Sequence, residues 1–461
     1  MSSANYPLCT SGIYRNLPTF DPSVKDLKAL VCGGTGISGF HAVRALLDTP
    51  RWSTVYVVSR SPLPESMAQL LADEQKQRIQ YISADLTAGP DAIAAKFKEA
   101  GAKPDYAFFF SYMNPKSGGA MSPNAAEELI KANVPIFDNF LQSLPKAGIQ
   151  PKRILLQTGG KNYGMWVKIV IQSCEANNLI ILRRHIARVS NPVVESDPQP
   201  THLQPNFYYH QKKLLFDYCT SHPETNWNVV RPCAIIGTVN KTWMNTFFPF
   251  AVYAAVQAHK KQPLEFGGDF ESWQYPFTNS SARMTGYLSE WVVLESHCAN
   301  QAFNANDGSP LSWERFFEAL AKWYGVEKGI NYPKPDEERT FDATMTLAGG
   351  KEAPLGYGPP SKIKRTFALA DWAKQSENQQ AWHEMQSAGS GKLDYDPFSS
   401  ESDIANNFSG DFAYLRFCMS HDKVRRYGFN GYVDALETVF EMYKEMQLMG
   451  MLPPMVVDAA R

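Results

Sequence analysis

A glycine-rich turn between an apolar run and a helical pattern constrains the fold of this chain more than any other feature. In the segment ALVCGGTGISGFHAV, apolar residues end directly before Gly33, and a helical periodicity follows. Glycine is required where a backbone turns tightly, where it approaches a pyrophosphate, and where a helix packs closely on a strand. A helix N-terminus adds free N–H groups that bind the anion. The pattern predicts a dinucleotide-binding turn whose members are Gly33, Gly34, Thr35, Gly36, Ile37 and Gly39.

Apolar runs alternate with amphipathic stretches through the first half of the chain. Strands that are buried on both faces of a parallel sheet are continuously apolar. Helical patterns lie between the apolar runs, for example at 37–47 and 123–144. We therefore predict an α/β fold with a doubly wound, parallel Rossmann-type sheet. The runs expected to form its strands are 30–32, 55–58, 79–82, 106–110, 154–156 and 229–236.

The length of 461 residues predicts a second lobe, because single cores usually stop growing below this size. We divide the chain into an N-terminal leader (1–25), a Rossmann domain (26–240) and a smaller, mostly helical substrate-binding lobe (241–461). We also consider residues 300–310 as a segment that adds a further strand to the sheet of the Rossmann domain. The lobe includes a last helix at 432–449, and segments 349–360 and 387–407 are predicted as loops. Another of its helices has one apolar face, formed by Trp313, Phe316, Phe317, Leu320 and Trp323.

Composition and charge exclude several classes of protein. The formal net charge is −1, and no cluster of Lys or Arg is large enough to hold a nucleic acid. No window has about eighteen consecutive apolar residues, and we find no targeting signal at the N-terminus, so a membrane span is not expected. The seven cysteines are scattered, and neither they nor the nine histidines have a metal-ligand spacing. We expect a cytoplasmic protein that binds no metal.

The end of the second predicted strand indicates which dinucleotide is bound. About 20 residues after the glycine turn, an NAD site usually has Asp or Glu for the ribose hydroxyls. This chain has Ser59, Arg60 and Ser61 there, and a guanidinium group suits a 2′-phosphate. We therefore predict NADPH as the cofactor. Asp85 and Leu86 follow the third strand, where a contact with the adenine is expected.

The fifth predicted strand leads to a first set of catalytic candidates. Hydride transfer places negative charge on a substrate oxygen, which a weak acid and a cation stabilise. The segment LLQTGGKNYG delivers Gln157, Lys161 and Tyr163 to the carboxyl edge of the sheet, where ligands bind in open α/β folds. We predict that Gln157 contacts the cofactor, that Lys161 supplies the cation, and that Tyr163 contacts the substrate.

A second set lies on the helix predicted in PNFYYHQKKLLFDY. Tyr209 and Lys213 are four residues apart and share one face. A phenol beside an ammonium group has a stabilised phenolate, which suits a proton donor. Tyr208 is adjacent and takes this role if the register of the helix differs by one residue; otherwise we expect it to contact the substrate. We rank Tyr209 first.

Several motifs together carry a family resemblance over most of the chain. GGTGISG, VVSRSP, LQTGGKNY, NFYY, VVRPCAIIG and QAFNANDG resemble the progesterone 5β-reductase and iridoid synthase-like branch of the short-chain dehydrogenase/reductase superfamily, and the C-terminal part is similar to its fungal members. The resemblance implies that NADPH adds hydride to the β-carbon of an α,β-unsaturated carbonyl, with Tyr209 and Lys161 as the catalytic pair. It also implies that Tyr112, after the fourth strand, lies near the nicotinamide.

Two departures from the family pattern bear on these roles. The family commonly has Glu-Asp two residues after NFYY, whereas this chain has Lys212 and Lys213, so the division of the cationic role between Lys161 and Lys213 stays open. In addition, residues from 165 to about 186 have no counterpart in the family pattern and mix apolar runs with basic residues. This insert is a lid, a membrane-touching helix, or translated intron sequence.

The segment TWMNTFFPFAVYAAV is either the wall of an apolar substrate cleft, in which Trp243 and Phe247 contact a lipophilic small molecule, or a helix of the apolar core. The same scaffold also suits reduction of a simple ketone or epimerisation of an alcohol. A catalytically silent NADP-sensing regulator is a third alternative, but it would not need Tyr209 or Lys161. The sequence identifies no protein partner, and a homodimer is compatible with it.

Overall fold

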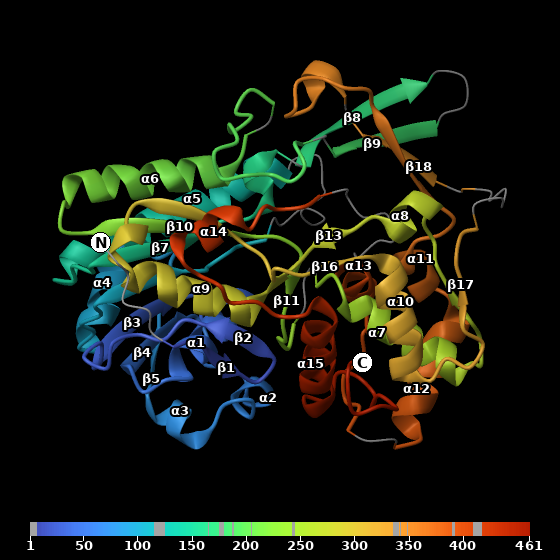
Figure 1. Cartoon of the computed structure of the whole chain (residues 1–461), viewed down its shortest axis with the longest axis horizontal. Helices are drawn as coiled ribbons and strands as arrows, with labels where there is room; N and C mark the ends of the chain where they lie inside the picture. Colours follow the sequence, from blue (N-terminus) through green and yellow to red (C-terminus); the bar gives the residue numbers. More distant parts are fainter. Residues whose placement is uncertain are drawn as a thin grey trace.

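Seven parallel strands form the central sheet (Figure 1). The computed structural model describes residues 7–114, 125–164, 166–174, 179–186, 189–203, 205–241, 245–334, 341, 343–347, 349–389, 392–408 and 417–461. The strand order runs outward from β3 in both directions, which makes the sheet doubly wound. In space the strands are β5 (Ile79–Ser83), β4 (Trp52–Ser59), β3 (Leu27–Cys32), β6 (Tyr106–Phe109), β7 (Arg153–Gln157), β10 (Asn226–Pro232) and β15 (Gln301–Ala305).

The predicted fold class is confirmed, and each of the six predicted runs overlaps a strand of this sheet. The last run, 229–236, extends beyond β10 into β11 (Ile235–Ile236), which pairs with β14 (Ser280–Ser281) outside the main sheet. Burial explains why apolar runs identify the strands. In β3, for example, Ala29, Leu30 and Val31 are completely buried between layers of helices.

The seventh strand, β15, comes from far along the chain. It pairs in parallel with β10, with Val230 opposite Phe303. It lies within 300–310, the segment that we considered as a further source of a sheet strand. Before it reaches β15, the chain has already formed α7 (Phe248–His259) and α8 (Phe270–Gln274) of the second lobe. The two lobes are therefore interleaved in sequence.

Two helices, α1 (Ile37–Leu47) and α9 (Ala282–Leu294), cover one face of the sheet. They lie so close together that a Cβ atom on Gly286 would be 2.8 Å from the Cβ atom of Ala45. On the opposite face, α4 (Pro90–Glu99), α5 (Ala125–Lys146) and α6 (Phe207–Ser221) pack against a separate apolar cluster. The start of α1 and the start of α6 both lie near the carboxyl ends of the strands, where the site is built.

The second lobe is mostly helical (Figure 1), and its core is rich in aromatic side chains. The apolar face predicted around Trp313 is buried, and the ring of Trp313 lies 4.8 Å from that of Phe250. One loop prediction was wrong: α13 lies within 387–407, where Ser400 caps it by accepting a hydrogen bond from the Asp403 N–H. Besides α7 and α8, the lobe contains α10 (Trp313–Tyr324), α11 (Leu369–Ala373), α12 (Ser376–Ser387), α13 (Glu401–Asn407) and α15 (Ala435–Leu448).

Antiparallel hairpins and short elements complete the description. The leader forms β1 (Cys9–Ser11) and β2 (Tyr14–Leu17). Within the insert, residues 166–174 and 179–186 form the antiparallel strands β8 (Trp166–Cys174) and β9 (Leu179–Ile186), so these described residues do not form the membrane-touching helix that was one of the alternatives. No helix in the described ranges is long and apolar enough to cross a bilayer. The remaining elements are α2 (Glu65–Ala68), α3 (Asp73–Gln77), α14 (Asp422–Tyr427), β12 (Leu264–Glu265), β13 (Phe277–Thr278), β16 (Pro310–Leu311), β17 (Ile330–Asn331), β18 (Ala343–Leu347), β19 (Ser361–Arg365), η1 (Gly160–Tyr163), η2 (Ser296–Cys298) and η3 (Gly350–Glu352).

Candidate active site

The packing around the glycine turn leaves no room for a side chain at Gly33 or Gly39. Gly33 has a φ of +78°, and a Cβ atom there would lie 2.7 Å from the backbone nitrogen of Ser111, after β6. A Cβ atom on Gly39 would lie 2.1 Å from the carbonyl oxygen of Gly33. The exposed Gly36 caps α1 without a side chain, so the N–H groups of the first turn face outward. This bare cradle fits a pyrophosphate group.

The ends of β4 and β5 carry the residues predicted at the adenosine end. The strands pair in parallel, with Ser59 opposite Ser83, and the Ser83 hydroxyl donates a hydrogen bond to the Arg60 carbonyl oxygen at 3.3 Å. Arg60 and Ser61 are exposed, whereas Leu86 is buried. Asp85 accepts hydrogen bonds from the N–H and hydroxyl of Thr87, which lower its pKa. The guanidinium group of Arg60 is therefore accessible at this edge.

Two buried polar atoms at the end of β7 have no hydrogen-bond partner within the described part of the chain. Gln157 donates from Nε2 to the hydroxyl of Ser38 at 2.8 Å, which ties β7 to the first turn of α1. The unpartnered atoms are Oε1 of Gln157 and Oγ1 of Thr158. Buried polar atoms without a partner are rare and call for an explanation such as a ligand. The side chain of Gln157 lies between β7 and the first turn of α1, where an unpartnered acceptor fits a dinucleotide.

Tyr208 places its hydroxyl at the carboxyl edge of the sheet. The hydroxyl oxygen would be 3.2 Å from a Cβ atom on Gly159, two residues after the end of β7. Tyr112, after β6, lies on the same side, with its ring 5.9 Å from that of Phe207, which in turn is 4.3 Å from the Tyr208 ring. Burial raises the pKa of Tyr208, and Tyr112 and Cys233 raise it further. The phenol is therefore protonated at neutral pH and able to donate a proton.

Tyr209, which we ranked first, faces a different part of the site. Its hydroxyl donates a hydrogen bond to the backbone oxygen of Asn162 in η1 at 3.0 Å. Burial raises the pKa of Tyr209 to about 12. The structure thus brings both phenols to the segment after β7, and it gives the position beside the strand end to Tyr208.

Lys161 lies in η1, immediately after β7. Its carbonyl oxygen accepts a hydrogen bond from Nδ2 of Asn206 at 2.8 Å, and Oδ1 of Asn206 caps α6 by accepting from the Tyr208 N–H at 3.0 Å. One asparagine therefore connects the turn that carries Lys161 to the helix that carries both tyrosines. Burial lowers the pKa of Lys161 to about 8.

The structure corrects the role expected for Lys213. Its side chain is 74% exposed and its Nζ pairs with Asp217 at 2.6 Å on the outer side of α6. Lys212, to which we gave no role, points inward and is 4% exposed. Lys212 lies on the side of α6 that faces the protein, where the buried positions are Phe207, Gln211, Lys212, Leu215 and Cys219.

Two predicted substrate contacts are also corrected. Tyr163 is 2% exposed, and its hydroxyl bonds to Asn304 and accepts from Nη1 of Arg231, so it belongs to the packed interior. Phe247 is completely buried in the aromatic core of the second lobe, with its ring 5.0 Å from that of Phe316. Trp243 lies outside the described residues.

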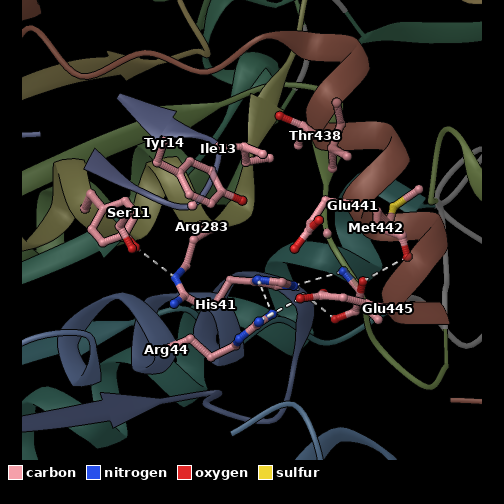
Figure 2. A pocket seen from close by; sticks show the side chains of 15 residues that line it. Ser11, Ile13, Tyr14, His41, Arg44, Arg283, Thr438, Glu441, Met442 and Glu445 are labelled. Carbon is pink, nitrogen blue, oxygen red and sulfur yellow. Dashed lines mark hydrogen bonds and ion pairs between the residues drawn. The ribbon is translucent and has the colours of Figure 1, made fainter. Parts of the chain in front are cut away.

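A separate cavity of about 130 Å³ lies where the lobes meet the N-terminal hairpin (Figure 2). Two ion pairs of 2.6 Å stand beside it, Arg44 with Glu445 and Arg283 with Asp48. His41 accepts a hydrogen bond from the Thr238 N–H at 2.9 Å, and burial lowers the pKa of His41 to about 3, which keeps it neutral. Because most of its charges are paired with one another, we interpret this cavity as part of the interface between the lobes.

Known proteins give a consistent set of similarities. Residues 29–344 match the family model of the PRISE-like Rossmann-fold domain. An uncharacterized protein of Schizosaccharomyces pombe is 27% identical over 440 residues, which are 92% of this chain and 98% of that protein. The short chain dehydrogenase gsfE of Penicillium aethiopicum is 24% identical over 435 residues, 92% and 99% of the two chains. The 3-oxo-Delta(4,5)-steroid 5-beta-reductase of Arabidopsis thaliana is 28% identical over 305 residues, 65% and 70% of the two chains.

Two of these relatives are named for dehydrogenase and reductase activity, and a parallel sheet with a bare glycine turn is the scaffold that such enzymes use. The protein is therefore an oxidoreductase of the short-chain dehydrogenase type. More specifically, it belongs to the PRISE-like Rossmann-fold family, since the family model matches well over half of the chain. The family resemblance of the sequence motifs is thus confirmed.

Proposed function

We propose that the protein uses NADPH to reduce the conjugated C=C bond of an α,β-unsaturated carbonyl in a lipophilic small molecule. The observation that carries this proposal is the protonated phenol of Tyr208 beside the end of β7. It stands at the edge of the sheet at which the glycine turn also opens. This edge is where ligands bind in open α/β sheets.

The roles of the residues follow from the charge that the reaction creates. When bound, the reduced dinucleotide supplies a hydride to the β-carbon, and the electron pair of the C=C bond moves toward the carbonyl oxygen. The Tyr208 phenol donates a hydrogen bond to that oxygen, and the ammonium group of Lys161 contributes positive charge nearby. A proton from water then adds at the α-carbon, and the electron pair on the oxygen re-forms the carbonyl. Tyr209 holds the η1 turn through Asn162, and no role is assigned to Lys213.

The choice of NADPH is supported by the exposed Arg60 at the end of β4. The substrate class is supported by the name of the Arabidopsis relative, which describes a steroid with a carbonyl conjugated to a C=C bond. A steroid is lipophilic, and the second lobe of this chain has an aromatic interior.

Product analysis tests the proposed reaction. Purified protein is mixed with NADPH and either progesterone or 2-cyclohexen-1-one, and the loss of nicotinamide absorbance is followed. We expect the saturated ketone as the product, identified by mass spectrometry and NMR. An allylic alcohol would instead show reduction of the C=O bond, and the absence of turnover with both enones would contradict the proposal.

A matched pair of variants tests which phenol acts. Tyr208→Phe removes the hydroxyl beside β7, and we expect kcat to fall about 10²-fold or more, the usual contribution of one hydrogen-bond donor to a developing oxyanion. Tyr209→Phe removes the hydroxyl that donates to the Asn162 carbonyl, away from the strand end, and its effect on kcat should be smaller. If Tyr209→Phe lowers kcat more than Tyr208→Phe does, the phenol that acts is Tyr209. Wild-type rates in both variants would show that neither phenol takes part in the reaction.

A further inference from the structure

Lys212 is a buried cation without a carboxylate partner among its described contacts. It is 4% exposed, and its Nζ donates a hydrogen bond to Oδ1 of Asn162 at 2.6 Å. The same Nζ lies 5.3 Å from the centre of the Tyr209 ring. Burying an ammonium group costs free energy unless it is well paired. A neutral amide and a ring only partly offset this cost, so the lysine is poorly explained by stability alone.

Asn162 connects this ammonium group to the rest of the site. Its side-chain oxygen accepts from Lys212, and also from Nε2 of Gln199 at 3.3 Å, while its backbone oxygen accepts from the Tyr209 hydroxyl. Asn162 is 1% exposed and directly follows Lys161. The conformation of η1, and hence the place from which Lys161 acts, is therefore held from α6 by two different side chains.

The groups around Lys212 favour loss of its proton. On β10, the guanidinium group of Arg231 repels it. Tyr209 on α6 is a neutral phenol, as is Tyr163 in η1. Burial first, and then the charge of Arg231, lower the pKa of Lys212 to about 7. The contact with Asn162 is strongest when the lysine is charged, so the bond weakens as pH rises through neutrality.

We propose that Lys212 is a positioning residue, whose ammonium group holds Asn162 and thereby keeps the Gly160–Tyr163 turn in the conformation that presents Lys161 to the substrate. This inference rests on the proposed function for its kinetic consequence. Its structural consequence, a hydrogen bond between a charged Lys212 and Asn162, does not depend on which reaction the enzyme catalyses.

The structural consequence is tested by NMR on the full chain labelled with ¹³C at Cε of lysine. We expect one lysine signal to titrate near pH 7 and to be absent in Lys212→Met. Asn162→Leu removes the acceptor and should shift that midpoint to lower pH. Lys213→Met, at the neighbouring exposed position, should leave the signal in place. If Lys212 titrates like an exposed lysine, or if Asn162→Leu leaves its midpoint unchanged, the proposal is overturned.

The kinetic consequence separates a positioning role from a merely structural one. We expect Lys212→Met to lower kcat for enone reduction at least about 10-fold, the scale of a displaced catalytic group, while KM for NADPH changes little. In the wild type, kcat should fall as pH rises through about 7. Lys212→Arg stays charged, so it should recover part of the rate. Its kcat should not decline near pH 7 and should decline only near pH 8, where Lys161 loses its proton.

The two hypotheses fail in different ways. A Lys212→Met enzyme with the wild-type kcat, or a Lys212→Arg enzyme with an unchanged pH profile, overturns the positioning role even if enones are reduced. If the wild type reduces no enone, the proposed function fails, and the NMR titrations still decide whether Lys212 and Asn162 are coupled. Should Lys212→Met not fold, the Arg variant and the Asn162→Leu titration decide in its place.

Discussion

Successive side chains of an α-helix point about 100° apart, and on α6 this rotation separates residues that are neighbours in sequence. Tyr208 reaches the end of β7, whereas Tyr209 bonds to the Asn162 carbonyl. In the same way, Lys212 points into the protein and Lys213 pairs with Asp217 on the surface. The chemistry of the site therefore depends on the register of a single helix to within one residue.

Gly39 is the residue of the glycine turn that tolerates a side chain least. In Gly39→Ala, the new Cβ atom would lie 2.1 Å from a backbone oxygen that cannot move away. We expect this variant to lose at least about 2 kcal/mol of folding free energy or not to fold. At Gly36 the nearest atom to a Cβ would be 3.4 Å away, so the unfolding midpoint of Gly36→Ala should stay closer to the wild type. Thermal unfolding without cofactor measures both, and equal losses would contradict the argument.

Arg60 decides the choice of dinucleotide if its exposed guanidinium group binds the 2′-phosphate. Hydrogen bonds to charged groups contribute about 1.5–3 kcal/mol, so Arg60→Ala should raise KM for NADPH about 10-fold or more. The KM for NADH should change little, because NADH has no 2′-phosphate. Steady-state kinetics with both dinucleotides make the comparison. An equal loss with both would place Arg60 outside cofactor selection.

The residues of the turn could be predicted because glycine itself carries the signal, whereas the roles of Tyr208, Lys212 and Lys213 could not. The motif NFYYHQKK contains two overlapping pairs with the same spacing, Tyr208 with Lys212 and Tyr209 with Lys213. The choice between them depends on where the helix begins, and here Asn206 caps it. Local sequence contains that cap, but it does not state which side of the helix meets the sheet.

Among elements, buried strands were the easiest to predict. A strand covered on both faces is apolar at every position, as in β6, so its residues identify it without any knowledge of its neighbours. The helix α1 was predicted with its observed bounds, because the glycine turn marks its start. By contrast, α13 has a polar composition, and only its Ser400 cap indicates a helix.

The contact between helices α1 and α15 leads to a prediction about stability. Arg44 and Glu445 form an ion pair of 2.6 Å with side chains 14% and 10% exposed. Burial raises the pKa of Glu445, but Arg44 and His41 lower it below its ordinary value. We expect Arg44→Met to lower the free energy of unfolding by about 3 kcal/mol, because it leaves a buried carboxylate unpaired.

Denaturant unfolding measures this loss, and Arg315→Met supplies the control, because Arg315 pairs with Glu318 at an exposed position. The double variant Arg44→Met with Glu445→Met should recover part of the stability. An effect of Arg44→Met no larger than that of Arg315→Met would show that the pair does not couple the helices.

At the scale of the whole molecule, His41 links the lobes in a way that depends on pH. It lies on α1 and accepts a hydrogen bond from Thr238, whose hydroxyl donates to the Met442 carbonyl of α15. Its pKa of about 3 in the folded protein lies below the ordinary value of 6.5. The unfolded chain therefore takes up more protons below about pH 6.5, and stability falls as pH falls, by about 1.4 kcal/mol per pH unit from this group.

His41→Gln removes the titrating group and retains a hydrogen-bond acceptor. We expect the unfolding midpoint of this variant to decline less than that of the wild type between pH 6.5 and pH 5. His202→Gln, at an exposed position, is the control. The same decline in His41→Gln and in the wild type would show that other groups determine the acid sensitivity.

Strand β15 is synthesised long after its partner β10, and this order affects folding during translation. On the ribosome, β10 emerges well before residues 301–305, so its outer edge stays without a hydrogen-bonding neighbour while the first helices of the second lobe are being synthesised. An open edge of this kind is a template for pairing with other chains. A chaperone that protects the nascent protein must therefore shield the edge of β10 until β15 has been translated.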